Sequence, residues 1–276
     1  MTVELDFAGK RVVVVGGTSG INRGIALAFA SHGAHVAVAS RSIEKVEDTV
    51  AALKAAGAGQ AIGAAFDVRN ADAVTDGLAA FHEQMGEFDV LISGAAGNFP
   101  ALAAEMSANA FKTVIDIDLM GTIHVMKGAY PFLKRPGASI VNISAPQAWI
   151  PYEGQSHVCA AKAGVDQITR TLSMEWGIEG IRINSVVPGF IEGTEGADRL
   201  APEGPARKMV LDSIPLGRLG NLQDMAGTCL FLGSELSSYI SGTVMVVDGA
   251  LYQRGGGQFG QMMGDMLRSV PKRNKG

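Results

Sequence analysis

A glycine cluster near the start of the chain has the residue types of a phosphate-binding loop. Residues 16–24 read Gly-Gly-Thr-Ser-Gly-Ile-Asn-Arg-Gly and directly follow the apolar run at residues 12–15. Glycine lets the backbone turn sharply and approach a pyrophosphate, and a helix that follows offers unpaired N–H groups and its positive dipole end. An ordinary glycine turn is the alternative interpretation. We predict that a dinucleotide binds here, through Gly16, Thr18, Ser19, Gly20 and Ile21.

The residues after the second predicted strand indicate which dinucleotide binds. An NAD site usually places an acidic residue there to hold the ribose hydroxyls, whereas this chain has Ser40, Arg41 and Ser42. Arg41 can pair with a 2′-phosphate and Ser42 can donate a hydrogen bond to it, which favours NADPH; a surface arginine is the alternative. Residues after the third and fourth predicted strands are expected to contact the rest of the nucleotide: Asp67, Val68, Ala95 and Gly97.

These loops require a sheet that brings the strand ends together, and the chain predicts one. Short apolar runs alternate with segments whose apolar residues recur at helical spacing. This alternation implies right-handed crossovers, so we predict an α/β, doubly wound Rossmann fold with a seven-stranded parallel sheet. The predicted strands are residues 12–15, 36–39, 61–66, 90–93, 139–144, 181–187 and 243–247, and the predicted helices are residues 21–32, 43–56, 71–85, 111–133, 157–177 and 224–232.

No linker divides the chain, so we predict one domain over residues 1–252. Residues 192–208 are less regular and are expected to form a loop or short helices over the site. Residues 253–276 are predicted to be a glycine-rich, partly flexible tail.

Composition and charge exclude several classes of protein. The chain of 276 residues is 47% hydrophobic with a net charge of -4, which excludes disorder by composition and a basic nucleic-acid surface. No apolar run approaches the roughly 18 residues of a membrane span. Cys159 and Cys229 have neither disulfide-framework nor metal-ligand spacing, so no metal site is expected. We see no signal peptide, and residues 274–276 are not a peroxisomal address, so we expect a cytoplasmic protein.

Taken together, the motifs resemble those of the short-chain dehydrogenase/reductase family over almost the whole chain. The resemblance rests on the glycine loop, Asp67-Val68, residues 93–97, Ser144, Lys162, Asn184-Ser185, Pro188-Gly189 and Asp248-Gly249. It implies a homotetramer formed through the two long helices. It also implies that Lys162 holds the nicotinamide ribose, that Pro188, Gly189 and Ile191 hold the carboxamide, and that Thr194 reaches the phosphates.

Three positions depart from the family pattern. Asn22 replaces a glycine, and asparagine tolerates positive φ well enough for the loop to survive. Asp118 replaces the usual active-site asparagine. Val158 stands four residues before Lys162, where the family has the tyrosine that exchanges a proton with an alcohol or carbonyl oxygen. Valine cannot do this, so ordinary ketone reduction is disfavoured while hydride transfer is retained.

One branch of the family combines these features. The chain is similar to 2,4-dienoyl-CoA reductases, above all the peroxisomal type, in residues 95–99, 109–118, 157–166, 175–177 and 193–196. The resemblance implies NADPH-dependent reduction of a conjugated 2,4-dienoyl-CoA to a 3-enoyl-CoA, an auxiliary step of fatty-acid β-oxidation. The alternatives are a family member acting on an oxoacyl thioester or ketone, and a non-catalytic NADPH-binding protein.

This chemistry requires groups that stabilise a dienolate and then protonate carbon. Asp118 and Asp166 are the candidate acids, with Asp118 ranked first, and Ser144 has a catalytic or a merely positional role. Asp166 lies four residues after Lys162 on one helix face, so the alternative for it is an ordinary ion pair. The substrate is expected to contact Asn98 and Gln147 through its thioester oxygen, Phe99 through its acyl chain, and Arg69 and Arg199 through the phosphates of coenzyme A.

Overall fold

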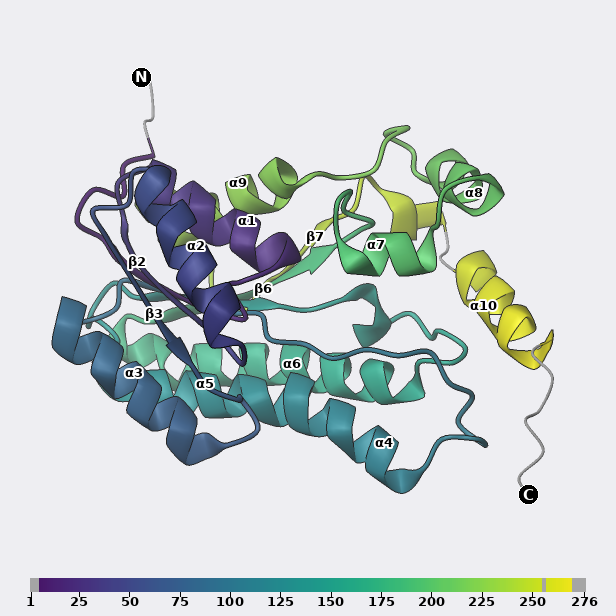
Figure 1. The fold of residues 1–276 in the computed structure, drawn as a ribbon, viewed down its shortest axis with the longest axis horizontal. Helices are drawn as coiled ribbons and strands as arrows, with labels where there is room; N and C mark the ends of the chain where they lie inside the picture. The colour runs from purple at the N-terminus through teal and green to yellow at the C-terminus, as the bar shows by residue number, and fades with distance from the viewer. Residues whose placement is uncertain (1–4, 255–256, 270–276) are drawn as a thin grey trace.

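Seven parallel strands form one sheet at the centre of the computed structural model, which describes residues 5–254 and 257–269 (Figure 1). The strands lie in the order β3-β2-β1-β4-β5-β6-β7. Their bounds are β1 Arg11–Val15, β2 His35–Ser40, β3 Gln60–Ala65, β4 Val90–Ser93, β5 Ser139–Ile143, β6 Arg182–Pro188 and β7 Val244–Val247. The predicted doubly wound, seven-stranded parallel sheet is confirmed.

Helices cover both faces of the sheet, because the central strands are apolar on both. In β1, residues Val12, Val13, Val14 and Val15 are at most 1% exposed. Side chains of a strand alternate between faces, so Val12 and Val14 pack in one core and Val13 and Val15 in the other. Figure 1 shows the two helical layers, formed by α1 (Gly20–Ser31), α2 (Ile43–Ala55) and α9 (Leu222–Gly233) on one face and α3 (Ala71–Met85), α5 (Gly121–Ala129) and α6 (Ser156–Glu175) on the other.

The strand order places a crevice between β1 and β4. The chain runs outward from β1 to β3, then returns to pair β4 with the other edge of β1. The connections after β1 and β4 therefore leave the sheet in opposite directions, which is where open α/β sheets bind their ligands.

The long helix predicted at residues 111–133 contains a π-helical turn. It consists of α4 (Ala108–Val114), the π-helical segment Ile115–Met120, and α5. Helix α6 crosses this segment closely, since a Cβ added to Gly164 would lie 2.8 Å from Leu119 Cδ1. A π-helical turn changes the direction of the side chains on it, and this contact fixes the segment against α6.

Short helices form near the carboxyl ends of the strands. The irregular segment predicted at residues 192–208 contains α7 (Glu195–Leu200) and the start of α8 (Pro205–Ser213), and the predicted tail contains α10 (Gly257–Ser269) (Figure 1). The rest of that tail, residues 255–256 and 270–276, lies outside the described residues. Within the described ranges, no helix has both the length and the hydrophobicity that crossing a bilayer requires.

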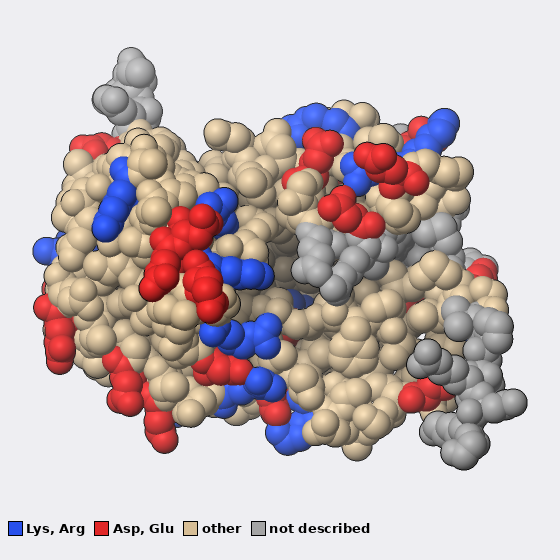
Figure 2. Space-filling view, viewed as in Figure 1, with Lys and Arg blue, Asp and Glu red and all other residues tan. Residues whose placement is uncertain are grey.

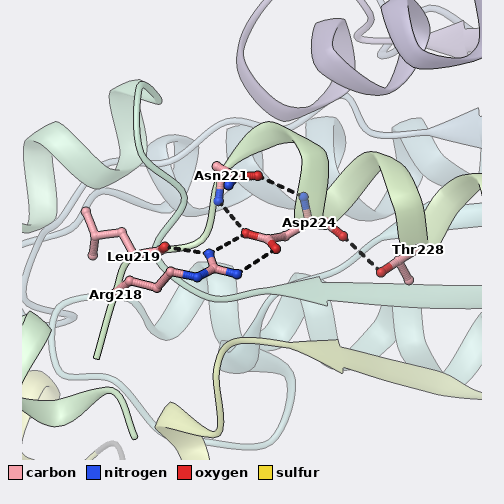
Figure 3. A network of polar contacts seen from close by, with 5 residues as sticks. All are labelled: Arg218, Leu219, Asn221, Asp224 and Thr228. Atoms are coloured by element: carbon pink, nitrogen blue, oxygen red, sulfur yellow. Dashed lines mark hydrogen bonds and ion pairs between the residues drawn. The ribbon is translucent and has the colours of Figure 1, made fainter. Parts of the chain in front are cut away.

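A polar network fixes the start of α9, which packs behind α1 (Figure 3). Asn221 and Asp224 form a reciprocal capping box, and Arg218 binds the carboxylate of Asp224 through two hydrogen bonds of 2.7 and 2.9 Å. The bond from Arg218 lowers the pKa of Asp224. Leu222, in the first turn, lies against Gly24 of α1, where an added Cβ would come within 3.0 Å. The cap therefore supports the helix that follows the glycine loop.

We expect Gly164→Ala to lower the free energy of unfolding by roughly 1–2 kcal/mol, because the new methyl group would crowd Leu119 by more than it gains in helix propensity. Urea unfolding measures the change. Gly227→Ala in α9 is the matched control, since no atom lies within 4 Å of its added Cβ, and this change is expected to stabilise. A gain of stability in both variants would contradict the close crossing.

Candidate active site

A cavity of about 540 Å³ lies at the carboxyl ends of β1, β2 and β4. Most of the predicted cofactor residues line it, namely Gly16, Thr18, Ser19, Gly20, Ile21, Arg41, Ser42, Asp67, Val68, Ala95 and Thr194. Asn22 and Lys45 line it too, although sequence reasoning did not assign them to the cofactor. The position of Lys45, in the first turn of the helix after Arg41, is a signal that could have identified it.

The glycine loop has the shape that a pyrophosphate requires. Gly16 has φ +81°, and a Cβ there would lie 2.8 Å from the backbone nitrogen of Ala95. The side chain of Ser19, the N-cap of α1, makes no capping hydrogen bond. The first N–H groups and the positive end of α1 are therefore left for an anion, so the loop fits a dinucleotide.

Asn22 contributes in a different way from the one expected. Its backbone is already helical within α1, and the positive φ angles of the loop are those of Gly16 and Gly20. Tolerance of positive φ is thus not what this position needs. Instead Asn22 Nδ2 donates a 2.7 Å hydrogen bond to the carbonyl oxygen of Gly94, and this bond ties α1 to the loop after β4.

Basic side chains lie along one side of a hollow in Figure 2. Arg41 and Lys45 line the cavity, and no described residue forms an ion pair with either of them. Arg69, predicted to bind coenzyme A, is instead paired with Asp67 at 2.6 Å. This contact lowers the pKa of Asp67 and leaves the guanidinium of Arg69 already engaged. Among the described residues that line this cavity, Arg41 and Lys45 are therefore the cations available to a phosphate.

Lys162 and Asp118 form a buried ion pair between α6 and the π-helical segment. Lys162 Nζ lies 3.4 Å from Asp118 Oδ2 and donates a 3.0 Å hydrogen bond to the carbonyl oxygen of Ile143, at the end of β5. Asp118 Oδ1 accepts a 2.7 Å bond from the N–H of Gly97, after β4. Ile143 and Ile117 line the cofactor cavity. Lys162 therefore pairs with Asp118 rather than with Asp166 on its own helix.

The position of the missing tyrosine is filled by packing. Val158 is 3% exposed and belongs to a small core with Val114 and Ala161. His157 is fully buried with its ring 4.7 Å from that of Phe99, and burial lowers the pKa of this histidine. The start of α6 therefore presents apolar and uncharged side chains where the family has a proton-donating tyrosine.

Asp166 is a second buried acid, below the end of β5. It is 2% exposed. Burial raises the pKa of Asp166, against the opposing effect of the neighbouring Ser144 and Ser185 hydroxyls. Ser144 is 2% exposed and follows β5, as predicted for the family serine. The carboxyl group therefore keeps its proton to a higher pH than a surface aspartate does.

A second cavity, of about 200 Å³, shares Ile21, Thr194 and Gly196 with the first. The residues predicted to hold nicotinamide line it together with a predicted substrate residue and two tyrosines: Pro188, Gly189, Ile191, Gln147, Tyr152 and Tyr252. Burial raises the pKa of Tyr152, so this phenol stays protonated. Sequence spacing could not place it, because it precedes α6 in a loop.

Asn98 and Phe99, two further predicted substrate residues, lie apart from these cavities. Asn98 is exposed, and Phe99 is half-buried against His157. Neither side chain lines the two cavities. The side chain of Arg199 lies outside the described part of the structure.

The fold and this site define the class of protein. Residues 15–251 match the model of the family described as enoyl-(acyl carrier protein) reductase. A short-chain dehydrogenase from Bacillus anthracis has a solved structure with a TM-score of 0.78 and 36% identity, covering 88% of this chain and 97% of that one. The chain belongs to the short-chain dehydrogenase/reductase family and is an oxidoreductase.

Within that family, the chain is similar to 2,4-dienoyl-CoA reductases. It is 42% identical over 241 residues to the peroxisomal 2,4-dienoyl-CoA reductase [(3E)-enoyl-CoA-producing] of Rattus norvegicus, covering 87% of this chain and 82% of that protein. It is 38% identical over 244 residues to the probable 2,4-dienoyl-CoA reductase [(2E)-enoyl-CoA-producing] of Bacillus subtilis, covering 87% and 95%. The resemblance stated from the motifs is confirmed.

The raised pKa of Asp166 predicts a pH dependence of stability. The unfolded chain releases this proton near pH 4, whereas the folded protein releases it at higher pH, so the folded state binds more protons between the two. The free energy of unfolding therefore falls as pH rises through that window. Asp166→Asn removes the effect, and we expect the variant to gain stability over the parent at pH 7 but little near pH 4.

Urea unfolding at a series of pH values tests this. Asp76→Asn, at an exposed position on α3, is the control. A difference between parent and Asp166→Asn that is constant with pH would show that the carboxyl group titrates as an ordinary one.

Proposed function

We propose that this protein reduces a conjugated 2,4-dienoyl-CoA to a 3-enoyl-CoA with NADPH. The observation that carries the proposal is the buried Val158, four residues before a Lys162 that is retained and paired with Asp118. Reducing a ketone requires a proton on oxygen in the product, which the family's tyrosine supplies. Saturating a conjugated carbon–carbon system does not. The similarity to the Rattus and Bacillus reductases supports this assignment.

NADPH, held by the glycine loop, Arg41 and the residues of the second cavity, would supply a hydride for C5 of the dienoyl thioester and would be oxidised to NADP⁺. Negative charge then spreads over the thioester oxygen, C2 and C4. The protein's task is to stabilise that charge and to direct one proton to carbon. The ammonium of Lys162, held by Asp118 in a water-poor interior, provides positive potential that already has its orientation before the reaction.

The position of protonation decides the product. A proton at C2 leaves the double bond between C3 and C4, which gives a 3-enoyl thioester, whereas a proton at C4 gives a 2-enoyl thioester. We infer protonation at C2, because one pair, Asp118 and Lys162, both stabilises the thioester oxygen and orients a water that carries the proton. The thioester oxygen and C2 are both bonded to the carbonyl carbon C1, so they lie at the same end of the dienolate. Asp166, whose pKa is raised by burial, lies next to Ser144.

Turnover of two thioesters tests the function. The purified protein with NADPH is expected to consume 2,4-hexadienoyl-CoA and to leave acetoacetyl-CoA almost unreduced. Nuclear magnetic resonance of the product locates its double bond. Reduction of acetoacetyl-CoA in preference to the dienoyl thioester would favour an oxoacyl reductase, and NADPH binding without turnover of either would favour a non-catalytic protein.

Asp118→Asn is expected to lower kcat by about 100-fold or more, since an amide can accept the Gly97 hydrogen bond but cannot hold the charge beside Lys162. NADPH affinity, measured by fluorescence, should change little. Asp118→Ala should lose activity and also about 3–5 kcal/mol of stability, because a buried ammonium is left uncompensated. Asp116→Asn, in the same π-helical segment, is the control. Parent-like turnover by Asp118→Asn would remove the carboxylate from the reaction.

Arg41→Ala is expected to weaken NADPH binding by about 10- to 100-fold and to leave NADH binding almost unchanged, because only NADPH carries the 2′-phosphate. Dissociation constants for both cofactors measure the effect. Arg69→Ala is the matched control, because that guanidinium is paired with Asp67. Equal losses for the two cofactors in Arg41→Ala would refute the phosphate contact.

A homotetramer, a cytoplasmic location and a role in auxiliary β-oxidation are further predictions of the same proposal. Size-exclusion chromatography with light scattering tests the first, and fractionation of cells tests the second. Several relatives are named as peroxisomal enzymes, so recovery of this protein in a peroxisomal fraction would contradict the cytoplasmic prediction.

A further inference from the structure

Three buried side chains connect the C-terminal helix α10 to the second cavity. Gln147 Nε2 donates a 2.6 Å hydrogen bond to Gln155 Oε1, and Gln155 Nε2 lies 3.9 Å from the sulfur of Met263, within hydrogen-bonding distance for a thioether. Gln147, Gln155 and Met263 are 8%, 0% and 3% exposed. Gln147 lines the cavity and Met263 belongs to α10, so a residue of the distant C-terminal segment reaches the site through one intermediate.

The sulfur determines which way each amide faces. A thioether can accept a hydrogen bond but cannot donate one, so Gln155 turns its NH₂ group toward Met263. Its oxygen then faces Gln147, which must in turn present its own NH₂ group to Gln155. The side-chain oxygen of Gln147 therefore faces away from Gln155. It is buried without a hydrogen-bond partner among the described residues.

Helix α10 is anchored next to this chain by two further contacts. Arg268 pairs with Glu153 at 2.6 Å. Leu267 occupies the space beside Gly154, which has φ +75° and where an added Cβ would lie 2.5 Å from Leu267 Cδ1. Glu153 and Gly154 directly precede Gln155, so these contacts hold α10 where Met263 meets the amide.

We propose that Gln147 Oε1 accepts a hydrogen bond from an amide N–H of a bound ligand, with Gln155 and Met263 as positioning residues. A buried acceptor without a partner is unfavourable unless a ligand supplies the donor. The cavity is lined by Pro188, Gly189 and Ile191 as well as Gln147, and two ligand groups have the required chemistry: the carboxamide of nicotinamide and the amide of the pantetheine arm beside the thioester. The sequence predicts a different contact for Gln147, with the thioester oxygen.

Matched ligands with and without the amide distinguish the two sources. Gln147→Leu is expected to weaken one amide-bearing ligand by about fivefold to tenfold and to leave its amide-free partner unchanged. For the cofactor, the pair is NADPH and its 3-acetylpyridine analogue, measured by fluorescence. For the thioester, the pair is a dienoyl N-acetylcysteamine thioester and the ethyl thioester, measured by calorimetry with NADP⁺ present.

The selective loss identifies the donor, and equal effects on both members of both pairs, or no effect on any ligand, would overturn the proposal. The thioester arm rests on the proposed function and the cofactor arm does not. Because every readout is binding, a protein that fails to turn over dienoyl thioesters still gives a decisive result.

The positioning role is tested by a double-mutant cycle. If Gln155 acts through Gln147, Gln155→Leu should produce the same selective loss, and the double variant should lose no more than Gln147→Leu alone. Met263→Leu preserves volume and should fold. It is expected to give part of the selective loss of affinity, because the Gln155 amide is then free to flip. Met266→Leu, at a position 56% exposed on the same helix, is the control. Additive losses in the cycle, or equal effects of the two methionine variants, would overturn the positioning role.

Discussion

A buried cation fixes the geometry of this active site. Removing an ammonium from water costs several kcal/mol unless a partner compensates its charge, and Lys162 is only 6% exposed. Its partner Asp118 is in turn held by the N–H of Gly97, and Lys162 itself by the carbonyl oxygen of Ile143. Four segments of the chain therefore meet at one charge pair: α6, the π-helical segment, and the ends of β4 and β5. A displacement of any of them would leave a buried charge or a polar group without a partner.

The sheet brings this pair next to the first cavity. Strands β1 and β4 are neighbours although β2 and β3 separate them in sequence, so the glycine loop and the loop after β4 face each other. Gly16 lies too close to Ala95 for any side chain, and Asn22 is bonded to Gly94. The same β4 loop contacts the nucleotide cavity on one side and supplies the Gly97 hydrogen bond to Asp118 on the other. The first cavity and the ion pair are thus connected through one segment, the loop after β4.

Local patterns predict the sheet and the glycine loop, because a strand buried on both faces and a strand–glycine–helix junction are each visible within a few residues. The π-helical turn is not visible, since one added residue leaves the apolar spacing of α4 and α5 intact. The sequence also does not predict the partner of Lys162, because helical spacing indicates only neighbours on the same helix. It therefore indicates Asp166 and not Asp118, which lies on another helical segment. Arg69 is predicted to bind a ligand, and the sequence does not show that Asp67, two residues away, pairs with it. The sequence does not predict helix α10, because the glycines in that segment suggest a loop.

The presence of Val158 in place of the family's tyrosine changes more than the source of one proton. A tyrosine at that position would place a strong donor close to Lys162 and would compete for any carbonyl oxygen in the site. With valine packed against Val114 instead, this position supplies no proton. Burial raises the pKa of Asp166 and of Tyr152, and Tyr152 lines the second cavity. In the proposed reaction, the ammonium of Lys162 stabilises charge on the thioester oxygen, and Val158 cannot protonate that oxygen as the family's tyrosine would. The charge must then be neutralised at carbon, and this is the condition that separates reduction of a conjugated double bond from reduction of a ketone.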